Sequence, residues 1–172
     1  MEVDLQGFLS QEDRQRYFPN IGIQELRDIL KQLGYDRHML IEYSSTEVCI
    51  ITPKGVLLQV RASDKGALGM WGGVLEDGEA PIDGAIREVK EETGISLGKE
   101  QMHFVGINPH LHRYANGDNA KFTSYRFVVR LDYVPNITLD NESLNYKYVK
   151  TLEECEGVLD QQKDFIRKVL SE

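Results

Sequence analysis

Apolar residues near the start of the chain recur with the period of a helix. Two helical stretches are predicted before residue 45, separated by a break at Pro19-Asn20. The second ends at Gly34 and carries one apolar stripe, made of Ile23, Leu26, Ile29, Leu30 and Leu33. Such a stripe has to be buried, either on the rest of the chain or on a second copy of it. Both arrangements are open from the sequence, and we favour the homodimer.

From residue 46 the pattern changes to that of strands. The turn signal Thr52-Pro53-Lys54-Gly55 lies between two apolar runs and predicts a hairpin. A glycine-rich loop over residues 64–79 leads to a helix that begins at Pro81 and ends at Gly94. The other predicted elements are strands at residues 103–107, 122–132 and 146–149 and a helix at residues 152–170.

Interleaved helices and strands predict an α/β or α+β fold with a mixed sheet. We divide the chain into an N-terminal helical extension, residues 1–45, and one domain, residues 46–172. The length of 172 residues is enough for one core with such an appendage.

Composition and charge narrow the class of protein. Hydrophobic residues make up 41% and charged residues 28% of the chain, which is typical of a folded globular protein. The formal net charge of −8 disfavours polymeric nucleic acid as a partner, because no excess of cations is available to neutralise its backbone. The chain has no apolar run of membrane-spanning length and no signal-like start. We therefore expect a cytoplasmic protein that binds no membrane.

Cysteine and histidine spacing gives no metal site. Cys49 and Cys155 belong to no CxxC pair, and both are expected to be buried as small hydrophobic residues. His110 and His112 would share one face of a strand, but two histidines without a third ligand are more typical of surface polar residues.

The most informative segment spans residues 73–95. On a helix, Glu88, Glu91 and Glu92 occupy about 100° of the circumference and therefore share one face. Three carboxylates at this spacing repel one another, and a hard divalent cation such as Mg²⁺ would offset the repulsion. Arg87 lies outside the trio, where it can hold a carboxylate by a charge-assisted hydrogen bond. A neighbouring apolar stripe is left to pack on the sheet, made of Ile82, Ile86, Val89 and Thr93.

This segment resembles the Nudix box without a mismatch. The matching positions are Gly73, Glu79, Arg87-Glu88-Val89, Glu91-Glu92 and Gly94-Ile95. The resemblance implies an α/β/α sandwich that hydrolyses a small-molecule nucleotide, namely a nucleoside diphosphate linked to another moiety such as a nucleoside triphosphate, ADP-ribose or a nucleotide sugar. It also implies Mg²⁺ as cofactor, with Mn²⁺ as a substitute.

Carried over by position, the resemblance assigns metal ligation to Glu88, Glu91 and Glu92, with Gly73 offering its carbonyl oxygen. Arg87 and Glu79 would orient the cluster. Many members add a glutamate from a later loop as ligand or base. Glu142, just before the last predicted strand, is the best match here. The general base is therefore expected to be Glu88 or Glu142.

Two further residues are candidates for substrate binding. Arg61 matches a position that often contacts substrate phosphate in this family. Trp71 stands in Met70-Trp71-Gly72-Gly73, where many relatives have Leu-Pro-Gly-Gly, and it would either stack on a base or pack in the core. The order of elements, with a loop at Asn116-Gly117-Asp118, looks like the bacterial MutT/Nudix group.

A non-catalytic reading also has to be weighed. A Nudix fold can serve as a nucleotide-sensing regulatory module, but such modules often lose box glutamates and this box is complete. A simple calcium-binding protein is disfavoured, because calcium loops carry alternating Asp and Asn ligands and not glutamates on a helix. We therefore predict a hydrolase of phosphoric anhydride bonds.

Overall fold

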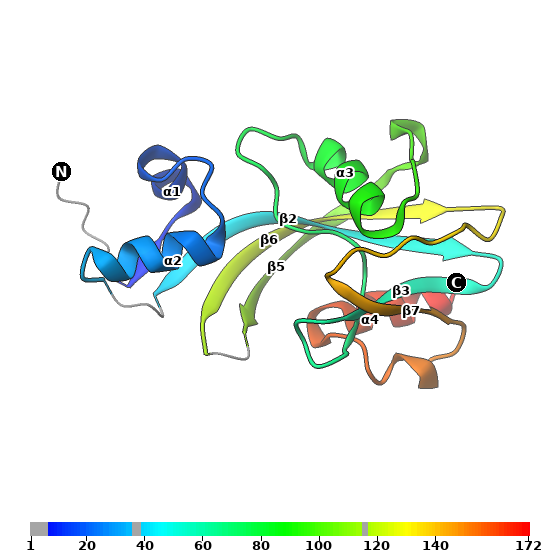
Figure 1. The fold of residues 1–172 in the computed structure, drawn as a ribbon. Helices are drawn as coiled ribbons and strands as arrows, with labels where there is room; N and C mark the ends of the chain where they lie inside the picture. Colours follow the sequence, from blue (N-terminus) through cyan, green and yellow to red (C-terminus); the bar gives the residue numbers. More distant parts are fainter. Residues whose placement is uncertain (1–6, 36–38, 115–116) are drawn as a thin grey trace.

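The computed structural model describes residues 7–35, 39–114 and 117–172, which form a mixed sheet with helices on both faces (Figure 1). In chain order the elements, with η for short 3₁₀ helices, are β1 (Phe8–Leu9), α1 (Gln11–Tyr17), α2 (Ile23–Gln32), β2 (Leu40–Thr52), β3 (Gly55–Arg61), β4 (Leu68–Gly69), α3 (Pro81–Thr93), η1 (Lys99–Gln101), β5 (His103–Arg113), β6 (Asn119–Arg130), β7 (Ser143–Val149), η2 (Glu153–Cys155) and α4 (Asp160–Leu170). The strand order is β4-β3-β2-β6-β5, with β1 paired to β2 and β7 paired to β3.

The sheet is built on β2. This strand pairs in parallel with β6 over residues 41–51 and antiparallel with β3 at the hairpin. The predicted turn is confirmed, since Thr52 lies opposite Gly55 and Thr52 Oγ1 donates a hydrogen bond to the Gly55 carbonyl oxygen. Because β2 begins at Leu40, it crosses the expected boundary between residues 45 and 46.

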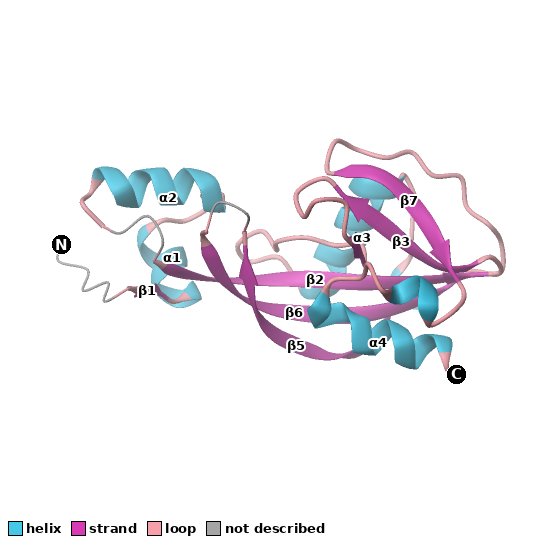
Figure 2. Ribbon diagram, turned by 90° about the horizontal axis from the view of Figure 1, so that it is seen from below, coloured by secondary structure: helices cyan, strands magenta, loops and turns pink. Residues whose placement is uncertain are grey.

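Two apolar cores lie on opposite faces of the sheet, which confirms the expected α/β/α sandwich (Figures 1 and 2). Along β2, Val48 and Ile50 face the core under α3, whereas Cys49 between them faces the core under α4. This alternation is the period of two that a strand imposes. Cys155 also belongs to the second core, and both thiols are free and buried, as expected.

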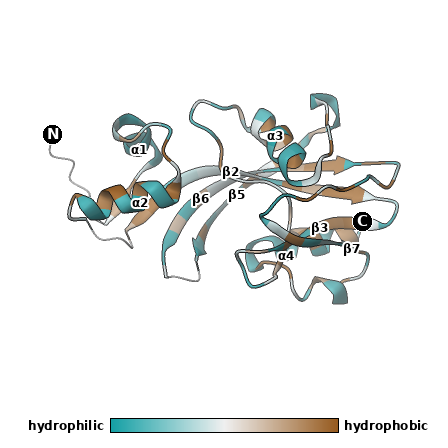
Figure 3. Ribbon diagram, viewed as in Figure 1, coloured by the Kyte–Doolittle hydropathy of each residue, from teal (hydrophilic) through white to brown (hydrophobic). Residues whose placement is uncertain are grey.

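The N-terminal extension packs on the far end of the same sheet. Leu26 and Leu30 of α2 are buried against Ile41 of β2 and Phe122 of β6 in a third apolar cluster. In Figure 3 the ribbon of α2 carries both hydrophobic (brown) and hydrophilic (teal) residues, and Leu33 at its end is 60% exposed. The central part of the predicted stripe is therefore covered within one chain, so a homodimer is not needed to bury it.

The last predicted helix is shorter than expected. Residues 152–170 were expected to form one helix, but they form η2 and α4 with a break at residues 156–159. The break arises because β4 uses the backbone there: Leu68 N–H donates to the Gly157 carbonyl oxygen at 2.8 Å, and Leu159 N–H donates to the Leu68 carbonyl oxygen at 2.9 Å. Backbone groups paired in this way are not available to a continuous helix.

Strand β5 ends later than predicted, at Arg113, and β6 begins earlier than predicted, at Asn119, because the two strands pair with each other as far as these two residues. Of the predicted turn between them, Asn116 lies outside the described residues, and Gly117 N–H donates to the Tyr114 carbonyl oxygen at 3.0 Å. Across the described ranges, no helix combines the length and apolarity needed to cross a bilayer.

Candidate functional site

The site is carried by α3, which has the predicted bounds. Pro81 occupies the first turn, and the helix ends where Gly94 N–H donates to the Lys90 carbonyl oxygen at 3.0 Å. Val89 and Thr93 of the predicted apolar stripe are fully buried against the sheet, and Ile82 and Ile86 are partly buried. The glutamates are therefore held on a rigid, anchored helix.

Arg87 connects the carboxylates of the segment. Its guanidinium donates to Glu79 at 2.8 Å, to Glu88 at 2.9 Å and to Glu91 at 3.2 Å. It also donates to the Val74 carbonyl oxygen at 3.3 Å, in the loop before the helix. This is the carboxylate-holding contact that the sequence predicts for Arg87, and it offsets part of the repulsion within the trio. The catalytic role of these residues stays a prediction.

Two of the three box glutamates are withdrawn from water. The Glu92 side chain is 1% exposed, and its Oε2 accepts a hydrogen bond from Gly72 N–H at 2.9 Å. Burial raises the pKa of Glu92 to about 8, against the opposing effect of that bond. Burial likewise raises the pKa of Glu88 to about 7, although Arg87 works to lower it. Repulsion from neighbouring carboxylates adds to both shifts.

The Gly72-Gly73 pair lets the backbone pass close to β2. Gly72 has a φ of 141°, and a Cβ atom there would lie 2.0 Å from the Thr46 carbonyl oxygen. A Cβ on Gly73 would lie 2.7 Å from the Glu88 carboxylate, which is the movable end of that side chain, so Gly72 is the position that requires glycine. The carbonyl oxygen of Gly73, expected to ligate a metal, accepts a hydrogen bond from Thr46 N–H at 2.9 Å. Its second lone pair remains for another partner.

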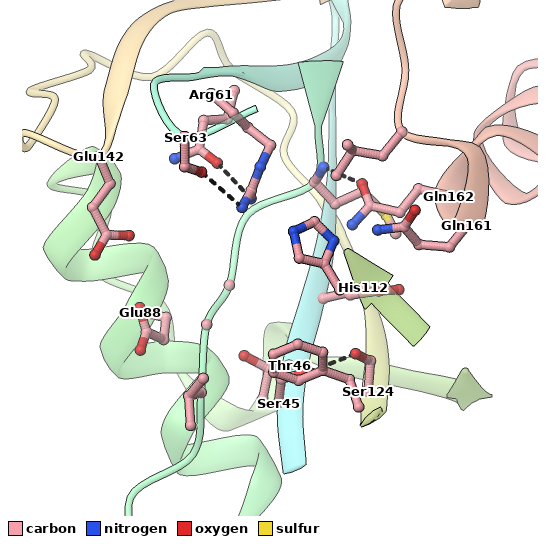
Figure 4. Close-up of a pocket in the computed structure, with 18 of the residues that line it drawn as sticks. Ser45, Thr46, Arg61, Ser63, Glu88, His112, Ser124, Glu142, Gln161 and Gln162 are labelled. Atoms are coloured by element: carbon pink, nitrogen blue, oxygen red, sulfur yellow. Dashed lines mark hydrogen bonds between the residues drawn. The ribbon is translucent and has the colours of Figure 1, made fainter. Parts of the chain in front are cut away.

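The structure brings Glu142 to the box, as expected. Its side chain is exposed in the loop before β7, and it lines the same cavity as Glu88 (Figure 4). The loop is fixed by bonds from Glu142 N–H to Asp140 Oδ1 at 3.1 Å and from Ala62 N–H to the Glu142 carbonyl oxygen at 3.0 Å. The charge of Glu142 contributes to the raised pKa of Glu88.

The donor set fits a hard divalent cation, since it offers carboxylate and carbonyl oxygens and no sulfur. In the described ranges, however, no three His, Cys, Asp or Glu side chains converge as a ready set of metal ligands. Glu88 and Glu91 point toward Arg87 instead. Metal ligation by these residues and by Gly73 and Glu142 therefore stays a prediction.

A cavity of about 750 Å³ opens beside the cluster. Arg61 lines it, and its Nε forms an ion pair with Asp64, while its contact with substrate phosphate stays a prediction. His112 lies 3.4 Å from the other oxygen of the same carboxylate. The sequence had placed His112 on one face with His110 but gave no reason to set it beside Arg61. Gln162, which also lines the cavity, was missed because a single glutamine on a helix carries no signal.

The expectation that Trp71 binds substrate is wrong. The side chain is fully buried, its Nε1–H donates to the Leu57 carbonyl oxygen at 2.8 Å, and it does not line the cavity. The backbone N–H of Trp71 bonds to the Val48 carbonyl oxygen, which directs the ring into the core under α3. Packing in the core, the other alternative from the sequence, is the one that the structure shows.

The N-terminal extension holds the loop before α3 through Asp77. Arg14 of α1, 3% exposed, forms an ion pair with Asp77 Oδ1 at 3.1 Å, and its guanidinium lies 4.0 Å from the centre of the Tyr43 ring. Asn20 N–H donates to Asp77 Oδ2 at 2.8 Å. Burial works to raise the pKa of Asp77, but these partners outweigh it and hold the pKa below its ordinary value. Asp77 is two residues from Glu79, which accepts a bond from Arg87. The extension therefore also fixes the loop that positions Glu79.

Comparison with known proteins identifies a family. The NUDIX domain matches residues 44–171. A MutT-like protein of Streptomyces ambofaciens is 42% identical over 53 residues, which is 31% of this chain and about a third of that relative, 34%.

Solved structures share the fold at low identity. The MutT protein of Methanosarcina mazei is 24% identical with a TM-score of 0.57, covering 74% of this chain and 91% of that one. The Escherichia coli dihydroneopterin triphosphate pyrophosphohydrolase is 24% identical with a TM-score of 0.63, covering 74% and 94%. A Caenorhabditis elegans Ap4A hydrolase is 19% identical with a TM-score of 0.56, covering 75% and 96%.

The raised pKa of Glu92 predicts a pH-dependent stability of the metal-free protein. Because the folded pKa of about 8 exceeds the ordinary 4.5, the contribution of Glu92 to stability is full below about pH 4.5 and is lost as the pH rises toward 8. In a chelator, we expect the urea midpoint to fall from about pH 5 to about pH 8. Glu92→Gln should flatten this slope, whereas Glu25→Gln on the exposed face of α2 should not. Parallel slopes for both variants would contradict the assignment.

The contact between the extension and the loop predicts a second effect on stability. Asp77→Ala leaves the buried Arg14 without its carboxylate, and we expect a loss of about 2 kcal/mol in the free energy of unfolding. Hydrogen exchange of the amides of residues 76–79 should accelerate by more than the global loss explains. Asp28→Ala, on the exposed side of α2, is the matched control. Unchanged exchange in this loop would show that Asp77 does not anchor it.

Proposed function

The chain belongs to the NUDIX family, and from that premise we propose that it hydrolyses a phosphoric anhydride bond in a nucleoside diphosphate linked to another moiety, with Mg²⁺ or Mn²⁺ as cofactor. The observation that carries the proposal is the cluster of Glu88, Glu91 and Glu92 on one helix face beside a cavity of substrate size. Two structural neighbours are named as a pyrophosphohydrolase and an Ap4A hydrolase, which supports this reaction class.

We propose the three glutamates, the Gly73 carbonyl oxygen and Glu142 as the groups that hold the cation. Bound there, a divalent cation supplies neutralisation of the diphosphate charge and a more acidic water molecule. The raised pKa values of Glu88 and Glu92 support this proposal, because carboxyl groups that are costly to ionise alone gain most from a nearby cation. Cation binding would release the protons that these groups hold at neutral pH.

Proton transfer, phosphate binding and positioning are the work of side chains of this protein. Glu88 is our choice for the general base, since it lines the cavity beside the proposed cation site and Arg87 holds its carboxylate in place. Glu142 on the same side of the cavity is the second candidate. Arg61 binds a phosphate oxygen, and Asp64 keeps its guanidinium directed along the cavity wall. Arg87 positions Glu88 through their bond of 2.9 Å.

A nucleotide-sensing module without turnover would not require this arrangement. Such a module needs the cavity but not three glutamates that repel one another and that Arg87 has to hold. The retained cluster therefore favours the enzyme. A panel of ADP-ribose, nucleoside triphosphates and nucleotide sugars, scored by phosphate or nucleotide release, tests the proposal directly.

Metal dependence is the first consequence. Hydrolysis should stop after exhaustive chelation and return with Mg²⁺ or Mn²⁺. Glu91→Gln should lower kcat by about 100-fold or more, because it removes a charge that stabilises the transition state, and its exposed position leaves the fold intact. Glu25→Gln, far from the site, should retain full activity. Turnover that survives chelation would rule out the mechanism.

Glu142 gives a second, independent consequence. Glu142→Gln should lower kcat with little change in KM, since the lost interaction acts mainly in the transition state. Because it removes a titrating carboxylate from the cavity, the substitution should also change the acidic limb of the pH–rate profile. Asp140→Asn, which keeps an acceptor for Glu142 N–H, should be milder. Superimposable profiles for wild type and Glu142→Gln would show that Glu142 is an ordinary loop residue.

A further inference from the structure

The cavity has a second end that the proposed chemistry does not use. Figure 4 shows Glu88 and Glu142 on one side of the cavity and Gln161 and Gln162, from the first turn of α4, on the opposite side. The volume of about 750 Å³ is in the range of pockets that hold a whole small ligand. A substrate with its diphosphate at the glutamates therefore has room to extend toward α4.

The Gln162 side chain is held in one orientation. It is 5% exposed, and its Oε1 accepts a hydrogen bond from Met70 N–H at 2.7 Å. Because a backbone N–H can only donate, the atom facing Met70 has to be the oxygen, which identifies Nε2 as the atom on the other side. Throughout the described ranges, the structure records no acceptor for this Nε2. The amide thus presents a fixed donor, and its own acceptor is already in use.

Packing around the amide prevents it from turning. Gln162 N–H donates to the Leu159 carbonyl oxygen at 2.9 Å, and Leu159 is itself bonded to Leu68 of β4. On the neighbouring strand, a Cβ atom added to Gly69 would lie 3.4 Å from Gln162 Oε1, so the strand approaches the amide closely. Helix and strand together fix the side chain before any ligand binds, which is the condition for selective recognition.

Several other polar groups that line the cavity have partners within the chain. Glu47 is neutralised by Arg126, 2.6 Å away, and Gln59 Nε2 donates to Ser143 Oγ at 2.6 Å. His110 Nδ1 lies 3.1 Å from the Asn108 carbonyl oxygen, and its ring stacks on Phe122. The half-buried Gln161 beside Gln162 also lines the cavity, but within the described residues no hydrogen bond fixes its side-chain amide. The wall therefore combines ring surfaces with one donor of fixed orientation, that of Gln162, which suits a planar, polar ring such as a nucleobase.

We propose that the end of the cavity at α4 binds the base of the nucleotide and that Gln162 selects guanine and uracil, which carry a carbonyl oxygen at purine C6 or pyrimidine C4, over adenine and cytosine, which carry an amino group there. This inference rests on the proposed function for the nucleotide itself. A free glutamine amide pairs with adenine by using its donor and its acceptor together. Here Met70 N–H occupies the acceptor, so Nε2 can bond a carbonyl oxygen at this position of the base but not an amino group. The amino groups of adenine and cytosine are donors too, so they form no hydrogen bond with the Nε2 donor of Gln162.

The test is binding of the monophosphates GMP, UMP, AMP and CMP, which contain no anhydride bond. Isothermal titration calorimetry with Mg²⁺ should show GMP and UMP bound at least about fivefold more tightly than AMP and CMP, the size expected for one hydrogen bond gained or left unmade. Equal affinities for all four would overturn the inference without any variant.

Gln162→Glu provides the sharper comparison. The carboxylate keeps an acceptor for Met70 N–H but replaces the donor by an acceptor, so the ratio of AMP to GMP affinity should invert. The ratio is the readout because the added charge weakens binding of all four nucleotides. Gln101→Glu is the matched control, since Gln101 Oε1 also accepts a backbone N–H, from Gly98 at 3.0 Å, and lies outside the cavity. It should leave the ratio unchanged.

The outcomes separate this inference from the proposed function. A uniform loss of affinity in Gln162→Glu, with the wild-type ratio retained, would place the amide against sugar or phosphate and overturn base selection. Metal-dependent hydrolysis without base preference would also overturn it while the hydrolase stands. Base preference without hydrolysis of any nucleotide in the panel would support the inference and overturn the hydrolase. Absence of binding by all four nucleotides would overturn the inference.

Discussion

The bonds of the Arg87 guanidinium are the interaction on which the site depends. One cation holds Glu79, Glu88 and Glu91, and the bond to Glu79 above all raises the pKa of Arg87 further above its ordinary range. Without this guanidinium, Glu88 and Glu91 would repel each other one helical turn apart. The buried Glu92 and the nearby Glu142 would add to that repulsion. The same guanidinium reaches the Val74 carbonyl oxygen, so the loop and the helix behave as one unit.

Much of the site was predictable because its determinants are local in sequence. A helix between Pro81 and Gly94 follows from the residues at its ends, and the spacing of the glutamates then fixes the face that they share. The order of helices and strands was predictable for a related reason, since apolar periodicity reports which face of each element is buried. The bounds of β2 and α4 were harder to predict from the sequence, because backbone pairing with distant residues decides where each of them begins.

The rest of the site depends on contacts between residues far apart in the chain. Trp71 is directed inward by bonds to Leu57 and Val48, which no local pattern around it reveals. The orientation of the Gln162 amide is fixed by Met70, 92 residues away, whose N–H donates to its Oε1. Arg14 and Asp77 are 63 residues apart, and each read alone is an ordinary surface charge. Such pairings are properties of the tertiary structure.

The length of β2 has a consequence for how the molecule folds. The strand contributes Ile41 to the cluster under α2, Cys49 to the core under α4 and Ile50 to the core under α3. Its parallel pairing with β6 joins Ser45 to Ser124 across 79 residues of chain, a loop whose closure costs entropy before its contacts can repay it. Ser45 and Ser124 both line the cavity, so this part of its wall is complete only once the long-range pairing is made.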